Sequence, residues 1–434
     1  MINSAAVAHK DSTRRTAAEL LIYACVAGVW FPAIDVTAGP VSLNICELSI
    51  LVASIALFGS TSIDKMLGRW TIAALFGLLA MAVLTGLQLL FVDDARPTFG
   101  VFLKFALSTV FVWLILTRED SDRIARTAIK VFIVMGSLSL LISNLDYFVD
   151  LVGGMTYASV GDRRSSGFFQ HANQYAIWIV SLVPFVILMV KNLALSALLL
   201  CNIGLALLLT GSKFNLAVFF VIVWFAVGLR VRIRFSVLIP LAVPVFAIGY
   251  SGVLNLILTI MGSINPSYAV KVQAALEDPL NANSFIERVD LWNNALRNGL
   301  ESPILGIGGG QAYTVLAYPH AHNLLLQYFL TYGLLGLTVM LSIFICSFGA
   351  AIDGRAANRD DYRCKCALIL SLSGIFISNQ LSDSMASQQI LLFGIVVGLT
   401  LTLYESRRQA QLAELTATQT TRVLHSHDAR VLGR

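Results

Sequence analysis

Charged residues are scarce in this chain, and their scarcity decides its class. Only 13% of the 434 residues are Asp, Glu, Lys or Arg, and 57% are hydrophobic. An ordinary soluble domain carries about 25% charged residues, so a soluble enzyme is excluded. Apolar runs long enough to cross a bilayer recur along the whole chain. We expect about twelve such spans, at residues 18–36, 41–59, 70–92, 98–116, 127–148, 173–190, 193–210, 214–229, 235–262, 323–350, 366–380 and 387–404.

Cysteines and nucleotide-binding motifs are equally sparse. Of six cysteines, four fall inside expected spans, and Cys364 and Cys366 fall at the predicted cytoplasmic end of another. No extracytoplasmic disulfide is therefore expected. The glycines at 306 and 308–310 are followed by no Gly-Lys-Ser/Thr and preceded by no expected strand. A phosphate-binding loop of the nucleotide type is excluded on that ground.

The basic residues predict the orientation of the chain in the membrane. With the N-terminus in the cytoplasm, 22 of the 30 Lys and Arg residues lie on the inner side. This bias predicts that both termini are cytoplasmic. The net charge of +5 reflects that topology, so we expect no nucleic-acid partner. No cleavage pattern follows the polar N-terminal stretch, and we expect the first helix to be retained.

The predicted spans divide the chain into four parts. We expect a transmembrane bundle at 1–262 with an outer loop at 149–172, a long periplasmic loop at 263–322, further spans at 323–404 and a cytoplasmic tail at 405–434.

Eight basic residues break the orientation rule, because they lie on or near the outer side. They are Arg96, Lys104, Arg163, Arg164, Lys213, Lys271, Arg288 and Arg297. Some of them can be plain solvated cations of short loops. Alternatively, they form a cationic cluster for an anionic substrate, where Arg can hold a phosphate with two hydrogen bonds.

The long loop contains the pattern of an amphipathic helix. Ser284 and Glu287 fit a capping box, which predicts a helix over about 285–298. Apolar residues then recur at helical spacing, at Phe285, Val289, Trp292 and Leu296. Such a helix lies on a membrane or covers a cavity. Arg288 on this helix belongs either to the cationic cluster or to a purely structural contact with its aromatic neighbours.

Two histidines mark the junction between this loop and the next apolar helix. His322 and Asn323 open that helix, whose dipole disfavours a protonated imidazole, so His322 could act as a general base. His322 and Gly333 are eleven residues apart and are expected to share a helix face. A plain interfacial histidine is the alternative. Zinc binding with His320 and His171 is not favoured, because no acidic or cysteine ligand stands nearby.

These residues carry a resemblance to a known family. His322-Asn323, nine residues, Gly333, two residues and Gly336 resemble the signature of the O-antigen ligase and O-antigen polymerase superfamily. Further matching segments are Glu287-Arg288-x3-Trp292, Pro303, Gly306-x-Gly308, Arg164-Ser-Ser-Gly167-Phe168 and His171-Ala-Asn173. Gly211-Ser212-Lys213 is similar to a short motif in which many members carry Ser-Arg, so Lys213 is a departure.

The resemblance implies an all-α, GT-C-like, metal-independent glycosyltransferase that needs no cofactor and faces the periplasm from the inner membrane. Its donor would be a glycan on undecaprenyl diphosphate, transferred with inversion to an acceptor hydroxyl. By the same resemblance, His322 would accept the acceptor proton and Arg288 would stabilise the departing diphosphate. The residues expected to help with the diphosphate are Arg164, Arg163 and Lys213, and those expected to bind sugar are His320, Asn323, Asn173 and His171.

Within this superfamily the sequence leans narrowly towards a polymerase of O-antigen or exopolysaccharide repeat units. A ligase that joins the glycan to lipid A–core stays open, as do a transporter or flippase and a scaffold. Glu47 is the clearest buried acid that a transporter could use. The expected partners are the lipid-linked oligosaccharide, the acceptor, membrane lipids and polysaccharide assembly proteins.

Overall fold

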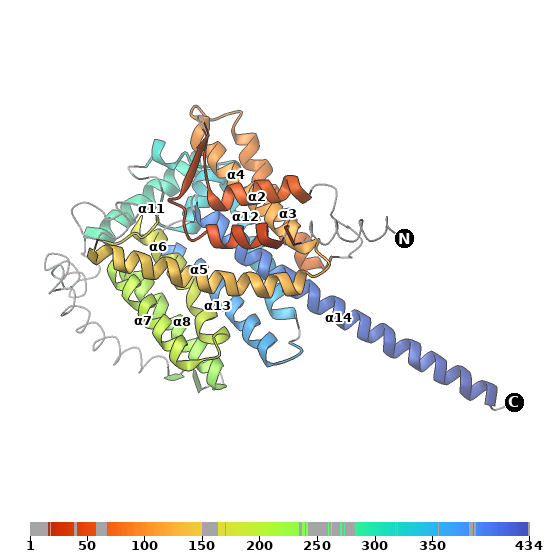
Figure 1. Cartoon of the computed structure of the whole chain (residues 1–434). Helices are drawn as coiled ribbons and strands as arrows, with labels where there is room; N and C mark the ends of the chain where they lie inside the picture. Colours follow the sequence, from red (N-terminus) through yellow and green to blue (C-terminus); the bar gives the residue numbers. More distant parts are fainter. Residues whose placement is uncertain are drawn as a thin grey trace.

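The computed structural model describes most of the chain. It covers residues 16–17, 19–38, 41–57, 67–149, 164–169, 171–233, 283–316, 318, 320–354, 356–381, 385 and 388–432, with isolated positions between 237 and 273. The described residues form a bundle of long helices with one short hairpin (Figure 1). The predicted all-α, multi-pass membrane class is confirmed.

Nine helices of the described part are long and apolar enough to cross a membrane. They are α3 (Arg69–Gln88), α4 (Ala95–Leu116), α5 (Ser121–Val149), α6 (Ala172–Met189), α7 (Leu193–Thr210), α8 (Lys213–Val231), α12 (Leu324–Asp353), α13 (Arg359–Leu381) and α14 (Gln388–Leu432). Each contains or overlaps one predicted span. Helix α6 is the most enclosed of the first six, because α7, α8 and α13 pack around it.

The first two predicted spans differ from the structure. A short helix, Glu19–Gly28, ends before Pro32, whose missing N–H cannot continue a helix. An antiparallel hairpin follows, formed by β1 (Asp35–Ala38) and β2 (Val41–Asn44). Helix α2 (Ile45–Leu57) then begins with a capping box, in which Asn44 and Glu47 bond each other's backbone N–H groups at 2.9 and 3.0 Å. The 13 residues of α2 extend about 20 Å, and residues 58–66 after them lie outside the described part of the chain.

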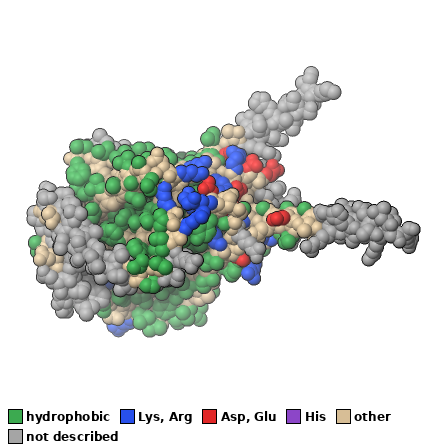
Figure 2. All heavy atoms as spheres, turned by 90° about the horizontal axis from the view of Figure 1, so that it is seen from below, with side chains coloured by type: hydrophobic (Ala, Val, Ile, Leu, Met, Phe, Trp, Pro, Cys, Tyr) green, Lys and Arg blue, Asp and Glu red, His purple; other side chains and the backbone are tan. Residues whose placement is uncertain are grey.

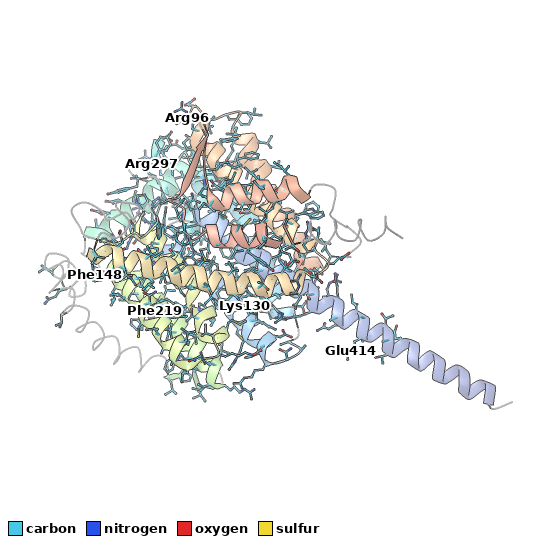
Figure 3. The ribbon with its side chains drawn as sticks, in the orientation of Figure 1. Arg96, Lys130, Phe148, Phe219, Arg297 and Glu414 are labelled. Carbon is cyan, nitrogen blue, oxygen red and sulfur yellow. The ribbon has the colours of Figure 1, made fainter. Side chains whose placement is uncertain are left out.

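The last helices are longer than predicted, and one predicted span cannot be assessed. Helix α13 begins at Arg359, seven residues before the predicted start at 366. Helix α14 continues through the predicted tail to Leu432 without a break and projects from the bundle (Figures 1 and 3). Glu414 lies on the projecting part, whereas Arg96 and Arg297 lie on the far side of the bundle (Figure 3). The predicted span 235–262 lies largely outside the described residues.

Helix α12 is broken at Gly333, and a loop fills the break. Gly333 has φ 64° and ψ −165°, a conformation that is essentially restricted to glycine. The backbone of the glycine-rich loop 303–311 bonds the broken turn: the N–H of Ile307 donates to Leu330 O at 2.9 Å, and that of Leu334 donates to Pro303 O at 2.8 Å. Polar backbone groups at membrane depth must be satisfied by protein, and this loop satisfies them.

Side chains of α3 and α4 fix the same loop. Gln88, the last residue of α3, donates to Leu305 O at 2.8 Å and to Thr331 O at 2.9 Å, and it accepts from the N–H of Gly309 at 2.9 Å. Thr98 of α4 donates to Gly309 O at 2.7 Å. One buried amide therefore joins the loop, the break in α12 and the end of α3.

Replacing Gly333 by alanine should destabilise the protein by about 2 kcal/mol or more, because φ is strained for an L-residue and the added Cβ would meet the backbone of Ile304. Thermal unfolding in detergent measures the loss. Gly204→Ala is the matched control: it lies within α7 and its Cβ would meet nothing within 4 Å, so that variant should be neutral or up to about 1 kcal/mol more stable. Equal stability of the two variants would contradict this account of Gly333.

Candidate functional site

Helix α11 (Asn283–Glu301) lies over the start of α12 and brings its residues to one end of the bundle. Leu291 and Ala295 are buried and pack in one cluster with Ala321 and Leu330. The amphipathic helix is confirmed, and Leu296 of its predicted apolar face is 46% exposed. The helix already includes Ser284 in its first turn, two residues earlier than predicted.

Three cations of the predicted cluster lie together at this end. Lys213, the first residue of α8, lies within electrostatic reach of both Arg288 and Arg164. Burial lowers the pKa of Arg288, and the positive charge of Arg164 lowers it further, against the opposing effect of Glu287. The Arg288 guanidinium is thus partly desolvated beside other positive charges, which is an arrangement that an anionic ligand would stabilise.

Local structure explains why Arg164 is held in this position. Its Nε donates to Thr210 O at 2.7 Å, and its terminal nitrogen donates to Asn173 Oδ1 at 3.2 Å. The following residues anchor the segment, since Phe168 and Phe169 are buried in the core. Phe169 packs on the ring of Trp178, with ring centres 4.8 Å apart. The Arg-Ser-Ser-Gly-Phe motif therefore combines one site cation with an aromatic anchor.

Three histidines form a row next to these cations. The ring centres of His320 and His322 are 4.5 Å apart, and those of His171 and His320 are 6.1 Å apart. His320 is buried between the other two rings. In the part of the chain that the structure describes, no group of three His, Cys, Asp or Glu side chains is arranged to hold a metal ion.

His322 has an unusual backbone conformation that its neighbours enforce. Its φ is +51°, in the left-handed region that costs an ordinary residue about 1–2 kcal/mol. On one side, the N–H of Ala321 donates to Gln327 Oε1 at 2.8 Å. On the other side, Asn323 caps α12 by accepting from the N–H of Leu326 at 3.0 Å, and it donates to Gln380 O at 3.1 Å. The chain is thus pinned immediately before and after His322.

This geometry corrects one prediction. Helix α12 begins at Leu324 with Asn323 as its cap, so His322 precedes the helix, and the helix is broken at Gly333. His322 and Gly333 therefore do not share one helical face. The residues between them form the first, capped part of α12, which ends at the break where the glycine-rich loop is inserted.

The cations and the histidines meet where three helices begin. Helix α6 starts after His171, α8 after Ser212 and α12 after Asn323. Asn173 joins the two groups, because it bonds Arg164 and lies two residues from His171. Each helix start contributes roughly half a positive charge, so the helix ends add to the attraction for an anion.

The remaining predicted residues have varied positions. Arg163 and Lys271 lie outside the described residues. Lys104 forms a buried ion pair with Glu47, with 3.5 Å between Nζ and Oε1, so both groups are compensated within the bundle. Arg96 and Arg297 are exposed. Asn323 has the structural bonds described above, and its contact with sugar stays a prediction.

Sequence reasoning missed the glutamines that hold this end together. Gln88 and Gln327 bond the backbone of α12 or of the loop before it, whereas Gln380 accepts through its backbone carbonyl from the side chain of Asn323. Gln88 and Gln327 are buried, although glutamine is usually exposed. A polar residue inside an apolar run was the signal that could have identified the first two.

One known family matches part of the chain. Residues 194–341 match the family described as O-antigen ligase. Over this segment, about a third of its length, the chain is similar to the O-antigen ligase family. The match bears out the predicted resemblance over these residues, and it supports a membrane enzyme of the O-antigen ligase or polymerase type. A comparison with curated proteins found no match.

The matched segment contains only part of the site. It runs from α7 to the middle of α12 and includes Lys213, Arg288, His320 and His322. Arg164, His171 and Asn173 lie outside it, and the fold brings them to the matched residues. The candidate site therefore combines the matched segment with the loop and the start of α6 that precede it in the sequence.

Replacing His322 by glycine should strongly lower glycan transfer without loss of stability. Glycine adopts positive φ without strain, so this variant removes the imidazole and keeps the backbone. We expect activity to fall about a hundredfold or more, as for the loss of a general base. Complementation of surface glycan and thermal unfolding measure the two effects. A fully active His322→Gly variant would remove His322 from the chemistry.

Proposed function

We propose that this enzyme transfers a glycan from undecaprenyl diphosphate to an acceptor hydroxyl on the periplasmic side of the inner membrane. The observation that carries the proposal is the link between the cations Arg164, Lys213 and Arg288 and the histidine row. Asn173 bonds Arg164 and lies two residues from His171, whose ring neighbours that of His320. The family match supports the ligase or polymerase type of reaction.

The cations suit a diphosphate leaving group. In the proposed reaction, the bond between the anomeric carbon and the diphosphate oxygen breaks, and negative charge grows on that oxygen. Fixed positive groups lower the barrier most where charge develops. Arg288 is partly buried beside the helix starts, and Arg164 is held by two hydrogen bonds, so both are preorganised for this role. Arg163 is proposed to assist from the adjoining position of the loop.

The histidines suit the acceptor. The acceptor oxygen attacks the anomeric carbon with inversion, and its proton passes to His322. His320 lies 4.5 Å from His322 between ring centres and is proposed to orient that ring while contacting sugar. His171, Asn173 and Asn323 stay proposed sugar contacts, because they border the same histidine row.

Polymerisation of O-antigen or exopolysaccharide repeat units is the form of the reaction that we propose, with a second lipid-linked repeat unit as acceptor. The departure at Lys213 from the commoner Ser-Arg motif favours it. Ligation to lipid A–core is the second candidate, because the matching family is described as O-antigen ligase.

Arg288→Lys and Arg288→Ala should each lower transfer about a hundredfold or more, because an ammonium cannot replace the planar, bidentate guanidinium. Purified enzyme with a lipid-linked oligosaccharide donor provides the measurement. Arg297→Ala is the control, since Arg297 is an exposed cation on the same helix and should be dispensable. Comparable losses in both positions would indicate a general effect of charge on α11 and would contradict the role of Arg288.

A deletion strain separates the two candidates. Loss of a polymerase should leave single repeat units on the lipid carrier or on lipid A–core. Loss of a ligase should leave long lipid-linked chains that are never attached to lipid A–core. Gel analysis of the glycans with a lipid A–core stain distinguishes these products, and unchanged glycans would contradict both candidates.

A further inference from the structure

A second cationic cavity lies at the opposite ends of the helices that build the candidate site. It has a volume of about 560 Å³. Apolar side chains of α6, α7 and α8 form most of its walls, among them Ile187, Ala197, Leu200 and Val227. The volume of the cavity is far larger than a single buried water molecule needs, and its apolar walls suit a hydrocarbon chain.

Four arginines line the same cavity: Arg230, Arg232, Arg359 and Arg363. Among the described residues, none of the four has a carboxylate oxygen within 4 Å. Arg230 is oriented by neutral acceptors, since it donates to Ile187 O at 2.5 Å and to Lys191 O at 3.2 Å. The Nε of Arg363 is buried without a hydrogen-bond partner.

The nearby acids are already engaged elsewhere. Asp360 pairs with Lys191 at 2.9 Å, and Asp361 pairs with Arg126. Asp360 also lies within electrostatic reach of Arg363, but none of the four arginines forms a direct ion pair with a described carboxylate. Figure 2 shows Lys and Arg side chains gathered next to apolar surface on the face seen from below.

The location relates this cavity to the membrane. Helix α8 begins with Lys213 at the candidate site and ends at Val231 beside the cavity. Helix α13 begins with Arg359 at the cavity and ends next to Gln380, which bonds Asn323. The cavity thus opens in the leaflet opposite the candidate site, at the end where the basic residues predict the cytoplasm.

The wall is also open to lipid. Leu193 is 71% exposed and Val231 is 59% exposed, although both line the cavity. An acyl chain can therefore enter sideways from the bilayer. Basic pockets between membrane helices on the cytoplasmic side bind the headgroups of anionic lipids.

We propose that this cavity binds an anionic phospholipid, with one acyl chain between α7 and α8 and the phosphate held by Arg359, Arg363 and Arg232. The bound lipid would connect the C-terminal end of α8 with the N-terminal end of α13. This proposal is independent of the glycan chemistry at the other end of the same helices.

Native mass spectrometry of the full chain, titrated with phosphatidylglycerol or phosphatidylcholine, tests the proposal. The unaltered protein should retain phosphatidylglycerol in preference to phosphatidylcholine. The double variant Arg359→Gln, Arg363→Gln should bind phosphatidylglycerol on the order of tenfold more weakly, given the contribution of each basic residue near anionic lipid. The control Arg69→Gln, Arg123→Gln removes the same charge from two exposed arginines elsewhere and should bind normally.

Two further arms separate a lipid from a plain anion. Ala197→Trp fills the apolar part of the cavity and should weaken phosphatidylglycerol binding while the arginines stay in place. Soluble glycerol phosphate at the same concentration should not displace the lipid. Circular dichroism confirms that each variant is folded, and Val227→Trp or the single variant Arg359→Gln replaces any that is not. Normal lipid binding by the arginine variant or the tryptophan variant, or full displacement by glycerol phosphate, would overturn the proposal.

Discussion

The need to satisfy backbone polar groups inside a membrane underlies the architecture of the site. Helix α12 is interrupted at Gly333, and such a break is tolerated only because the loop 303–311 bonds the exposed groups. Once that loop is inserted, Gln88 locks it to α3. Helix α11 packs against the start of α12, and the residues just before α12 are fixed by a hydrogen bond to Gln327. Arg288 and His322 are therefore brought to the same end of the bundle.

The site concentrates like charges that would otherwise separate. Arg164, Lys213 and Arg288 repel one another, and three helix starts add to the positive potential. Their positions are maintained by bonds to neutral groups, such as those of Arg164 to Thr210 O and Asn173 Oδ1. The fold thus offsets the electrostatic repulsion between the cations, and an anionic ligand would relieve that repulsion on binding. In the proposed reaction, this arrangement would prepare binding energy in advance for the release of diphosphate.

The lengths of the apolar runs and the histidine motif predicted the helices and the loop–helix junction well, because both are local properties of the sequence. Contacts between distant segments were not predictable in this way. The sequence does not indicate that Gln88 reaches Thr331, or that Gly333 breaks a helix to admit a loop. Capping illustrates the limit. The predicted capping box at Ser284 and Glu287 stays a prediction, whereas Asn44 and Glu47 form an unpredicted capping box inside an apolar stretch that resembled a single span.

Helix α14 has a mechanical consequence. It is 45 residues long and unbroken, which corresponds to about 68 Å, more than twice the thickness of a bilayer core. Its first half packs against α4, α5 and α12, and its far half projects from the bundle as a rod (Figure 1). A rod of this kind is a lever: a slight tilt of the packed half is magnified at the free tip. Rearrangements within the bundle would thereby be transmitted well beyond the lipid headgroups.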